Sequence, residues 1–321
     1  MAPSNRIIML GTGDFALPTF EHLIETGYNV VALVTQPDRP QGRKQELIPS
    51  KIKRSAEARR VLVEQPEDVN ASASQVRISE LKPDLLVTAA YGQILSGTLL
   101  SIPGLGGINL HGSILPAFRG AAPVARAIQN GETETGVTVI RMTPQIDAGG
   151  IVSIARIRID PDETAGELEA RLAQLGAPLI VDAIAALASG AVTILPQDRS
   201  KVTKAPKLRK EDGLIDWSRP AFSVHNLVRA MQPWPVTYTA WRPRSIPSTE
   251  PIRWIVHKTQ VVDGQGGEPG EVIEAAGDRL VVAAGVGAVA LLTIQLAGKK
   301  PFTAAEFLRG HRIQPGDRLG L

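Results

Sequence analysis

The feature that most constrains the fold is a series of short apolar runs without polar alternation, separated by segments with helical spacing. These runs are Arg6–Leu10, Val30–Thr35, Leu85–Ala90 and Gly107–Leu110. A strand that is buried on both faces has this character. We therefore predict an α/β fold built on a parallel sheet with helices on both faces. Val137–Met142 and Ile151–Ile159 are expected to be later strands.

Helices are predicted between and after these strands. Apolar spacing favours a helix over Phe15–Thr26. Thr164 and Glu167 form a capping box at the start of a helix that we expect to end near Gly176. Pro178–Ala188 is predicted to be a second, separate helix.

The character of the sequence changes after residue 190. A length of 321 residues suggests two domains, at roughly 150 residues per domain. We predict an α/β domain over residues 1–190, a basic linker over residues 191–213 and a smaller domain with a β-barrel over residues 214–321. A helix is expected at residues 223–231, before a series of short β-like runs between glycine and proline turns. These runs are Ile252–His257, Glu271–Glu274, Arg279–Ala283 and Ala288–Leu296.

The two parts of the chain carry opposite net charge. Residues 1–190 hold 17 Lys and Arg against 20 Asp and Glu, whereas residues 191–321 hold 18 against 12. The resulting charges of −3 and +6 are consistent with an anionic partner that docks across both parts, and chance variation in composition is the alternative. The densest basic cluster lies within Lys201–Lys210.

Composition excludes several kinds of site. The chain has no cysteine, which rules out disulfides, a cysteine nucleophile and a thiolate-ligated metal. Its five histidines are dispersed and lack the spacing of a zinc site, so we expect no metal. The N-terminus lacks the pattern of a secretory signal, and the longest apolar stretch, Leu280–Leu292, is too short to cross a bilayer. We therefore expect a cytoplasmic protein without a membrane partner.

The first turn matches a dinucleotide-binding fingerprint. The segment Gly11–Ala16 reads GTGDFA, follows a predicted strand and opens a predicted helix. Asp14, however, puts a carboxylate where a phosphate would sit, and the acidic residue expected after the second strand is displaced to Asp38 in a proline-rich loop. Packing of a strand against a helix explains the same glycines.

Polar residues at the end of one predicted strand are the main candidates for chemistry. Asn109 and His111 alternate with Leu110, so their side chains lie on one side of the strand. Ligands of parallel sheets bind beyond the carboxyl ends of the strands. An amide can hold a developing oxyanion, and a histidine can donate to it or shuttle a proton. Two polar residues that satisfy a loop backbone are the simpler interpretation of this pair alone.

Two further loops can complete such a site. Gly112–Pro116 is irregular and apolar, which suits a loop that presents backbone groups to a flat heterocycle. Asp147 lies between apolar and glycine residues after a predicted strand, where its carboxylate can orient His111 and support the protonated imidazole. An aspartate that caps its own turn is the alternative interpretation.

All of these motifs occur together in one family. The chain resembles the methionyl-tRNA formyltransferases over essentially its whole length. The central signature N-x-HGSLLPxxRGAAP appears as Asn109 to Pro123, with Ile114 in place of leucine. Gly13 stands where the family usually has proline, and Lys44-Gln45-Glu46 follow Arg43 where the family is often more basic. Other matching segments are Gly11–Ala16, Thr35–Arg43, Ala90–Gly92, Glu134–Thr138, Asp147–Gly149, Ile215–Ser218, Pro233–Pro235, Ala297–Lys300 and Pro315–Leu319.

The resemblance implies a fold, a reaction and a site. The fold would be a Rossmann-like formyltransferase domain followed by an OB-like domain. The reaction would be transfer of a formyl group from 10-formyltetrahydrofolate to the α-amino group of methionyl initiator tRNA. Asn109, His111 and Asp147 match the family's catalytic positions. The folate would be a cosubstrate, with no permanently bound cofactor, and we expect a monomer. The residues assigned to folate are Ser113, Ile114, Leu115, Pro116, Tyr91 and Gly92.

Basic residues are the candidates for contacts with tRNA phosphates, because lysine and arginine position RNA without reading its sequence. In the family, the loop that contains Arg43 approaches the acceptor arm of the tRNA. The other candidates are Lys204, Lys207, Lys210, Lys299 and Lys300.

Three other functions stay open on the sequence. A formyltransferase that acts on a small amine, such as a sugar nucleotide or glycinamide ribonucleotide, would need no basic β-domain. A nicotinamide-dependent oxidoreductase would use Gly11–Ala16 and would be saturated by NADH rather than by folate. An RNA-binding protein without catalysis would have no use for Asn109, His111 and Asp147 together.

Overall fold

The computed structural model of this chain describes residues 5–41, 46–190, 192–242, 251–264 and 266–320. The chain divides into two units. Unit 1 comprises Met1–Pro123, Glu134–Arg158 and Leu168–Pro206. Unit 2 comprises Val124–Thr133, Ile159–Glu167 and Lys207–Leu321. The three-part division at residues 190 and 213 stays a prediction.

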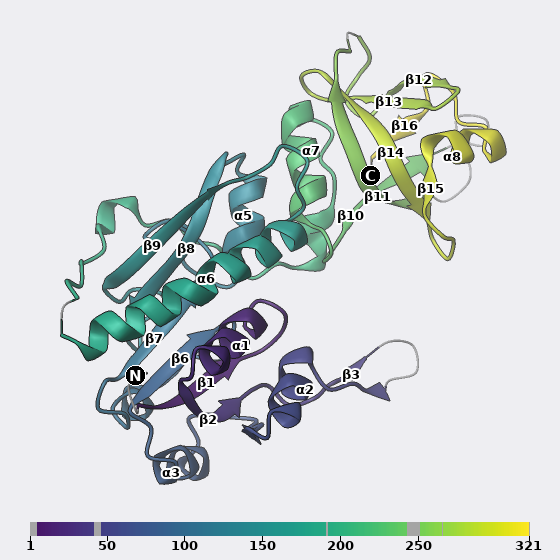
Figure 1. The fold of residues 1–321 in the computed structure, drawn as a ribbon. Coiled ribbons are helices and arrows are strands. Elements are labelled where there is room, and N and C mark those ends of the chain that lie inside the picture. The colour runs from purple at the N-terminus through teal and green to yellow at the C-terminus, as the bar shows by residue number, and fades with distance from the viewer. Residues whose placement is uncertain (1–4, 42–45, 191, 243–250, 265, 321) are drawn as a thin grey trace. The chain divides into compact units, whose positions relative to one another are not determined.

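Unit 1 is built on a seven-stranded sheet in the order β5-β2-β1-β6-β7-β8-β9 (Figure 1). The neighbouring strands β5, β2, β1, β6 and β7 are parallel to one another, whereas β8 and β9 are added antiparallel at the β7 edge. The α/β class predicted from the unalternating runs is confirmed, and the sheet is mixed rather than wholly parallel. Its strands are β1 (Arg6–Gly11), β2 (Asn29–Val34), β5 (Leu62–Glu64), β6 (Leu85–Ala89), β7 (Gly107–His111), β8 (Glu134–Arg141) and β9 (Ile151–Arg158).

Helices cover both faces of this sheet. On one face, Ile8 and Leu10 of β1 share a core with residues of α3 and α4. On the opposite face, Leu110 of β7 contacts Gly176 of α6. The remaining elements of unit 1 are α1 (Leu17–Glu25), the short strands β3 (Pro40–Gln41) and β4 (Glu46–Leu47), α2 (Lys51–Ala58), α3 (Ser72–Glu80), α4 (Gly97–Leu100) and most of α6 (Ala165–Ala188). The helix α5 (Pro123–Gln129) belongs to unit 2 from Val124 onward.

The helix α6 is continuous, which corrects the prediction of two helices separated near Gly176. Pro178 lies inside the helix without ending it. A Cβ atom at position 176 would lie 2.4 Å from Leu110 Cδ2, so the glycine permits close packing of helix on sheet rather than termination of the helix. By length and composition α6 could also cross a membrane, but it buries residues such as Leu168 and Leu172, as the core helix of a folded domain does.

Unit 2 contains an antiparallel sheet in the order β12-β13-β14-β11-β10-β16, and β15 pairs with β14. The two edges of the sheet are joined, because the Val272 N–H donates to the Asp317 carbonyl and the Leu319 N–H donates to the Gly270 carbonyl. This near-closure confirms the predicted OB-like β-barrel. The elements are α7 (Ala221–Ala230), β10 (Thr237–Arg242), β11 (Ile252–Val262), β12 (Val272–Ala276), β13 (Arg279–Ala283), β14 (Ala288–Leu296), β15 (Phe302–Thr303), α8 (Ala304–Gly310) and β16 (Arg318–Leu319).

Residues 195–206, which lie inside the predicted basic linker, are bonded to the loops of unit 1. Leu195 exchanges two backbone hydrogen bonds with Ile151, at 2.7 and 2.9 Å. The Arg119 N–H donates to the Thr203 carbonyl at 2.9 Å, and the Ala205 N–H donates to the Arg119 carbonyl at 2.7 Å. Ala205 is fully buried. We call these residues the 195–206 segment; it includes a 3₁₀ turn, η1 (Arg199–Lys201), and a second turn, η2 (Lys210–Gly213), follows it.

Candidate active site

Asn109 lies near the carboxyl end of β7, on the face of the sheet opposite α6. The register of β6 and β7 sets Thr88 beside it, and the Thr88 hydroxyl donates to Asn109 Oδ1 at 2.6 Å. Because this bond occupies the amide oxygen, the amide nitrogen is directed away from Thr88 with both of its protons available. Among the residues that the structure describes, none accepts a hydrogen bond from that nitrogen. Asn109 therefore presents an oriented donor.

His111 is buried at the end of the same strand, with 5% of its surface exposed. Its Nε2 atom lies 2.9 Å from the Phe118 carbonyl oxygen. A carbonyl can only accept, so Nε2 carries a proton. Its Nδ1 atom lies 3.5 Å from Asp147 Oδ2, so a ring that is also protonated at Nδ1 forms an ion pair with this carboxylate.

Asp147 is held by a residue far from it in sequence. The Gly120 N–H donates to Asp147 Oδ2 at 2.9 Å, across 27 residues of chain. The carboxylate thus faces His111 and Gly120 rather than capping its own turn, as the alternative interpretation would have it. The structure therefore brings Asp147 and His111 together, as the sequence predicts, with Asn109 two residues before His111 on the same strand.

Both partners of His111 come from residues with unusual backbone geometry. Phe118 has φ +60° and Asp147 has φ +48°, in the left-handed region that costs a non-glycine residue about 1–2 kcal/mol. Strain of this kind persists only where the surroundings impose it, and it clusters at functional sites. Gly149 allows the turn that contains Asp147 to approach the backbone of Arg141 closely, because a Cβ atom at position 149 would overlap the Arg141 carbonyl oxygen.

The loop between His111 and Gly120 is fixed by threonine hydroxyls. The Thr138 hydroxyl donates to the Ser113 carbonyl at 2.7 Å and accepts from the Leu115 N–H at 3.1 Å. The Thr203 hydroxyl accepts from the Phe118 N–H at 2.8 Å. Several of the backbone groups predicted to face a heterocycle are therefore engaged within the protein, and the loop is preorganised.

The six residues assigned to folate differ in their accessibility. Ser113 and Leu115 are buried, and the Ser113 hydroxyl donates to the Ala117 carbonyl. Tyr91 is also buried, in the core with Leu95, and burial raises the pKa of its hydroxyl, as does the Asp68 carboxylate. Ile114 and Pro116 are half-buried, and Gly92 is exposed. These last three are the members of the set that a ligand can touch, and the assignment to folate stays a prediction.

The first turn has the features of strand–helix packing. A Cβ atom at Gly11 would lie 2.6 Å from the Ala16 Cβ, so the glycine is needed for the contact between β1 and the start of α1. Asp14 forms an exposed ion pair with Lys51 at 2.7 Å. Gly13 has φ +75°, a conformation that glycine adopts without strain. The glycines therefore have a structural explanation without a bound pyrophosphate.

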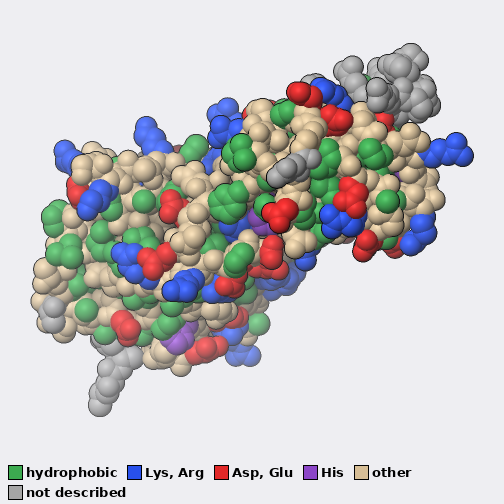
Figure 2. Space-filling model, turned by 90° about the horizontal axis from the view of Figure 1, so that it is seen from above, with side chains coloured by type: hydrophobic (Ala, Val, Ile, Leu, Met, Phe, Trp, Pro, Cys, Tyr) green, Lys and Arg blue, Asp and Glu red, His purple; other side chains and the backbone are tan. Residues whose placement is uncertain are grey.

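The lysines assigned to tRNA are all exposed. Within the described part of the chain, none of them has an acidic partner. On the face drawn in Figure 2, basic and acidic side chains are interspersed. Arg43 lies outside the described residues. The five described lysines are Lys204, Lys207, Lys210, Lys299 and Lys300.

Several residues that shape the site cannot be identified from local sequence pattern. Thr88 orients Asn109, but its role depends on the register of two strands that are distant in sequence. Gly120 was visible only as part of the signature; its φ of +127° and a Cβ position 2.5 Å from the Ala205 oxygen exclude any other residue without rearrangement. Gln197 lay in a segment predicted to be a linker.

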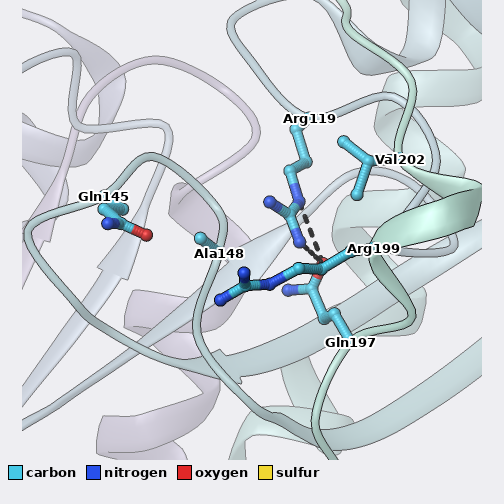
Figure 3. Close-up of a pocket in the computed structure, with 6 residues that line it drawn as sticks. All are labelled: Arg119, Gln145, Ala148, Gln197, Arg199 and Val202. Carbon is cyan, nitrogen blue, oxygen red and sulfur yellow. Dashed lines mark hydrogen bonds between the residues drawn. The ribbon is translucent and has the colours of Figure 1, made fainter.

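A pocket of about 390 Å³ borders the Asp147 loop. In Figure 3 the side chains of Arg119 and Gln197 point toward each other, and Arg199 extends beside them. Two guanidinium groups and two carboxamides line it, and none of the described lining residues is acidic. Its lining residues are Arg119, Gln145, Ala148, Gln197, Arg199 and Val202.

Comparisons with known proteins identify the class of protein to which this chain belongs. Residues 5–184 match the family model described as formyl transferase, and residues 207–312 match the model of the formyl transferase C-terminal domain. The chain is thus a formyltransferase of two domains. Solved structures share this fold at low identity: the sugar 3N-formyl transferase WlaRD, solved with 5-N-formyl-THF, has a TM-score of 0.66 at 16% identity and covers 92% of this chain and 99% of its own.

Curated relatives narrow the class. The methionyl-tRNA formyltransferase of Geobacter sulfurreducens is 43% identical over 98% of this chain and 96% of its own length. That of Bacillus licheniformis is 41% identical, with 98% of each chain covered. The chain belongs to the methionyl-tRNA formyltransferase family.

Proposed function

We propose that this enzyme transfers the formyl group of 10-formyltetrahydrofolate to the α-amino group of methionyl initiator tRNA, a step of translation initiation. The observation that carries the proposal is an oriented Asn109 amide two residues before His111, whose ring pairs with Asp147. An oriented amide donor that has no acceptor among the described residues suits a reaction in which negative charge develops on a carbonyl oxygen.

In the proposed reaction, the amine attacks the formyl carbon and a carbon–nitrogen bond forms. The formyl oxygen becomes an oxyanion, which accepts a hydrogen bond from the Asn109 amide. Collapse of the tetrahedral intermediate breaks the bond to N10 of the folate. N10 gains a proton and the attacking amine loses one, so the step needs no oxidant or reductant.

His111 and Asp147 support this charge and the proton transfer. Both ring nitrogens of His111 face acceptors of the protein, so the first contribution of a protonated ring is its positive charge beside the oxyanion. A direct hydrogen bond from His111 to the oxyanion requires the ring to release the Phe118 carbonyl, and it stays a prediction. Asp147 orients the imidazolium and accepts the amine's proton, directly or through a water.

The partners follow from this reaction. The folate is a cosubstrate that is consumed in each turnover. The tRNA is held through its phosphates by Arg43 and by the exposed lysines, of which Lys204, Lys207 and Lys210 lie at three-residue intervals and Lys299 and Lys300 are adjacent. We propose that the enzyme acts as a monomer in the cytoplasm, where initiator tRNA is charged and used.

One assay tests the function. Purified protein is mixed with 10-formyltetrahydrofolate and methionyl-tRNA, and the product is resolved by its mobility on an acid gel. We expect formylmethionyl-tRNA with the tRNA substrate and none with an amino-sugar nucleotide or glycinamide ribonucleotide. Product with a small amine alone, or thermal protection by NADH and none by folate, would overturn the proposal.

A further inference from the structure

The side chain of Gln197 joins the two loops that hold His111 and Asp147. Its Oε1 atom accepts from Arg119 Nε at 3.0 Å and from Arg119 Nη2 at 2.6 Å (Figure 3). Its Nε2 atom donates to the Asp147 carbonyl at 2.8 Å and to the Gly149 carbonyl at 2.7 Å. All four hydrogen bonds are partly buried and span at least 48 residues of sequence.

Only a carboxamide can make this set of bonds. A guanidinium donates and never accepts, so it must face the amide oxygen of Gln197. A backbone carbonyl accepts and never donates, so Asp147 and Gly149 must face the amide nitrogen. The orientation of the amide is therefore dictated by its partners. A glutamate of the same length could keep the pair with Arg119, but would place an acceptor against both carbonyl groups.

Asp147 is consequently held at two points. Gly120 binds its carboxylate and Gln197 binds its carbonyl oxygen. The two supports are structurally linked. Arg119, which binds the Gln197 side chain, directly precedes Gly120, and its backbone is hydrogen-bonded to Thr203 and Ala205 of the 195–206 segment that also contains Gln197. The left-handed backbone of Asp147 costs free energy, and this double support opposes its relaxation.

We propose that Gln197 is a positioning residue that fixes the Asp147 carboxylate against His111. The inference rests on the proposed catalytic role of Asp147. Gln197 touches neither reacting atom in this account; it acts through the backbone of the Asp147 turn. A displacement of about 1 Å in such a group is enough to lower a rate substantially, whereas substrate binding does not depend on it.

The test uses Gln197→Met, which keeps the length of the side chain and removes all four hydrogen bonds, and Gln197→Glu, which keeps the contact with Arg119. We expect each to lower kcat by about tenfold, with KM for folate and for tRNA within about twofold of the wild-type values. The matched control is Gln129→Met, since Gln129 also accepts from an arginine, Arg126, at 2.8 Å. The control should leave kcat and KM unchanged.

A double-mutant cycle separates positioning from general stability. If Gln197 acts through the Asp147 carboxylate, Gln197→Met has little further effect on kcat in the Asp147→Asn background. Multiplication of the two effects, or an unchanged kcat in Gln197→Met and Gln197→Glu, would overturn the proposal. Thermal unfolding is measured for each variant, and the Glu variant carries the test if the Met variant does not fold. An inactive wild-type enzyme in the formylation assay would instead contradict the proposed function.

Discussion

The end of β7 and the basic cluster Lys201–Lys210 differ in how their functional side chains are held. His111 and Asp147 are largely buried, and each is bonded to a loop of unit 1. Lys204, Lys207 and Lys210 are exposed and, within the described residues, have no acidic partner. Groups that act on reacting atoms need fixed geometry, whereas groups that attract phosphate act through charge that tolerates motion.

This difference has a kinetic consequence. Loss of a fixed group in the β7 site should lower kcat and leave the salt dependence of binding unchanged. Loss of an exposed lysine should raise KM for tRNA and weaken the salt dependence, because it contributes uniform binding. Each prediction below tests one side of this contrast.

The largest effect is expected for His111→Ala and Asp147→Asn. Asparagine tolerates the left-handed backbone of position 147, so Asp147→Asn removes the charge with little added strain. We expect each variant to lower kcat by about 100-fold or more, as loss of electrostatic support for a transition state typically does. Steady-state kinetics with methionyl-tRNA measure the effect, and circular dichroism checks the fold. A folded variant with wild-type kcat would show that the substituted residue has no role in catalysis.

An intermediate effect is expected for Thr88→Val, which replaces the hydroxyl by a methyl group of similar size. The Asn109 side-chain oxygen, Oδ1, loses its hydrogen-bond donor, and the side-chain amide is then free to rotate away from the oxyanion. Loss of one orienting hydrogen bond should lower kcat by about tenfold, with KM for both substrates little changed. Thr88→Ser, which retains the hydroxyl, should restore most of the rate. Equal rates in the Val and Ser variants would show that this hydrogen bond does not matter.

The smallest effect on turnover is expected for the triple variant Lys204→Gln, Lys207→Gln and Lys210→Gln. We expect a higher KM for methionyl-tRNA, an almost unchanged kcat, and a slope of log affinity against log salt that is shallower by roughly one unit or less per lost contact. Lys82→Gln, an exposed lysine outside the candidate sites, is the control. If the wild type and the triple variant have the same KM for methionyl-tRNA at both of two salt concentrations, the RNA binds elsewhere. Lys299 and Lys300 are then the next candidates.

The sequence predicts features that depend on local pattern. The unalternating strands led to the α/β class, the turn-rich second half led to the barrel, and alternation placed Asn109 and His111 on one side of β7. The prediction at Gly176 was wrong, because a glycine in a helical pattern has two explanations: the end of a helix, or close contact with a neighbour. Only the position of Leu110 decides between them.

Features that depend on distant partners could not be predicted in this way. The bond from Thr88 to Asn109 requires the register of β6 against β7. The role of Gln197 requires a segment with the composition of a linker to pack beside the Asp147 turn. Solvent exposure is also a tertiary property, and Leu115 shows the consequence: its side chain is buried, so it is poorly placed to touch a ligand although the loop around it is part of the signature.

The proposed function depends on an oriented Asn109 amide that stabilises the charge developing during formyl transfer. The most direct measurement is the single-turnover rate of formylmethionyl-tRNA formation by Asn109→Ala, with saturating folate and tRNA, alongside thermal protection by folate. We expect a rate constant at least about 100-fold below that of the wild type in a protein that folate still protects. A folded Asn109→Ala enzyme that formylates methionyl-tRNA at close to the wild-type rate would contradict it.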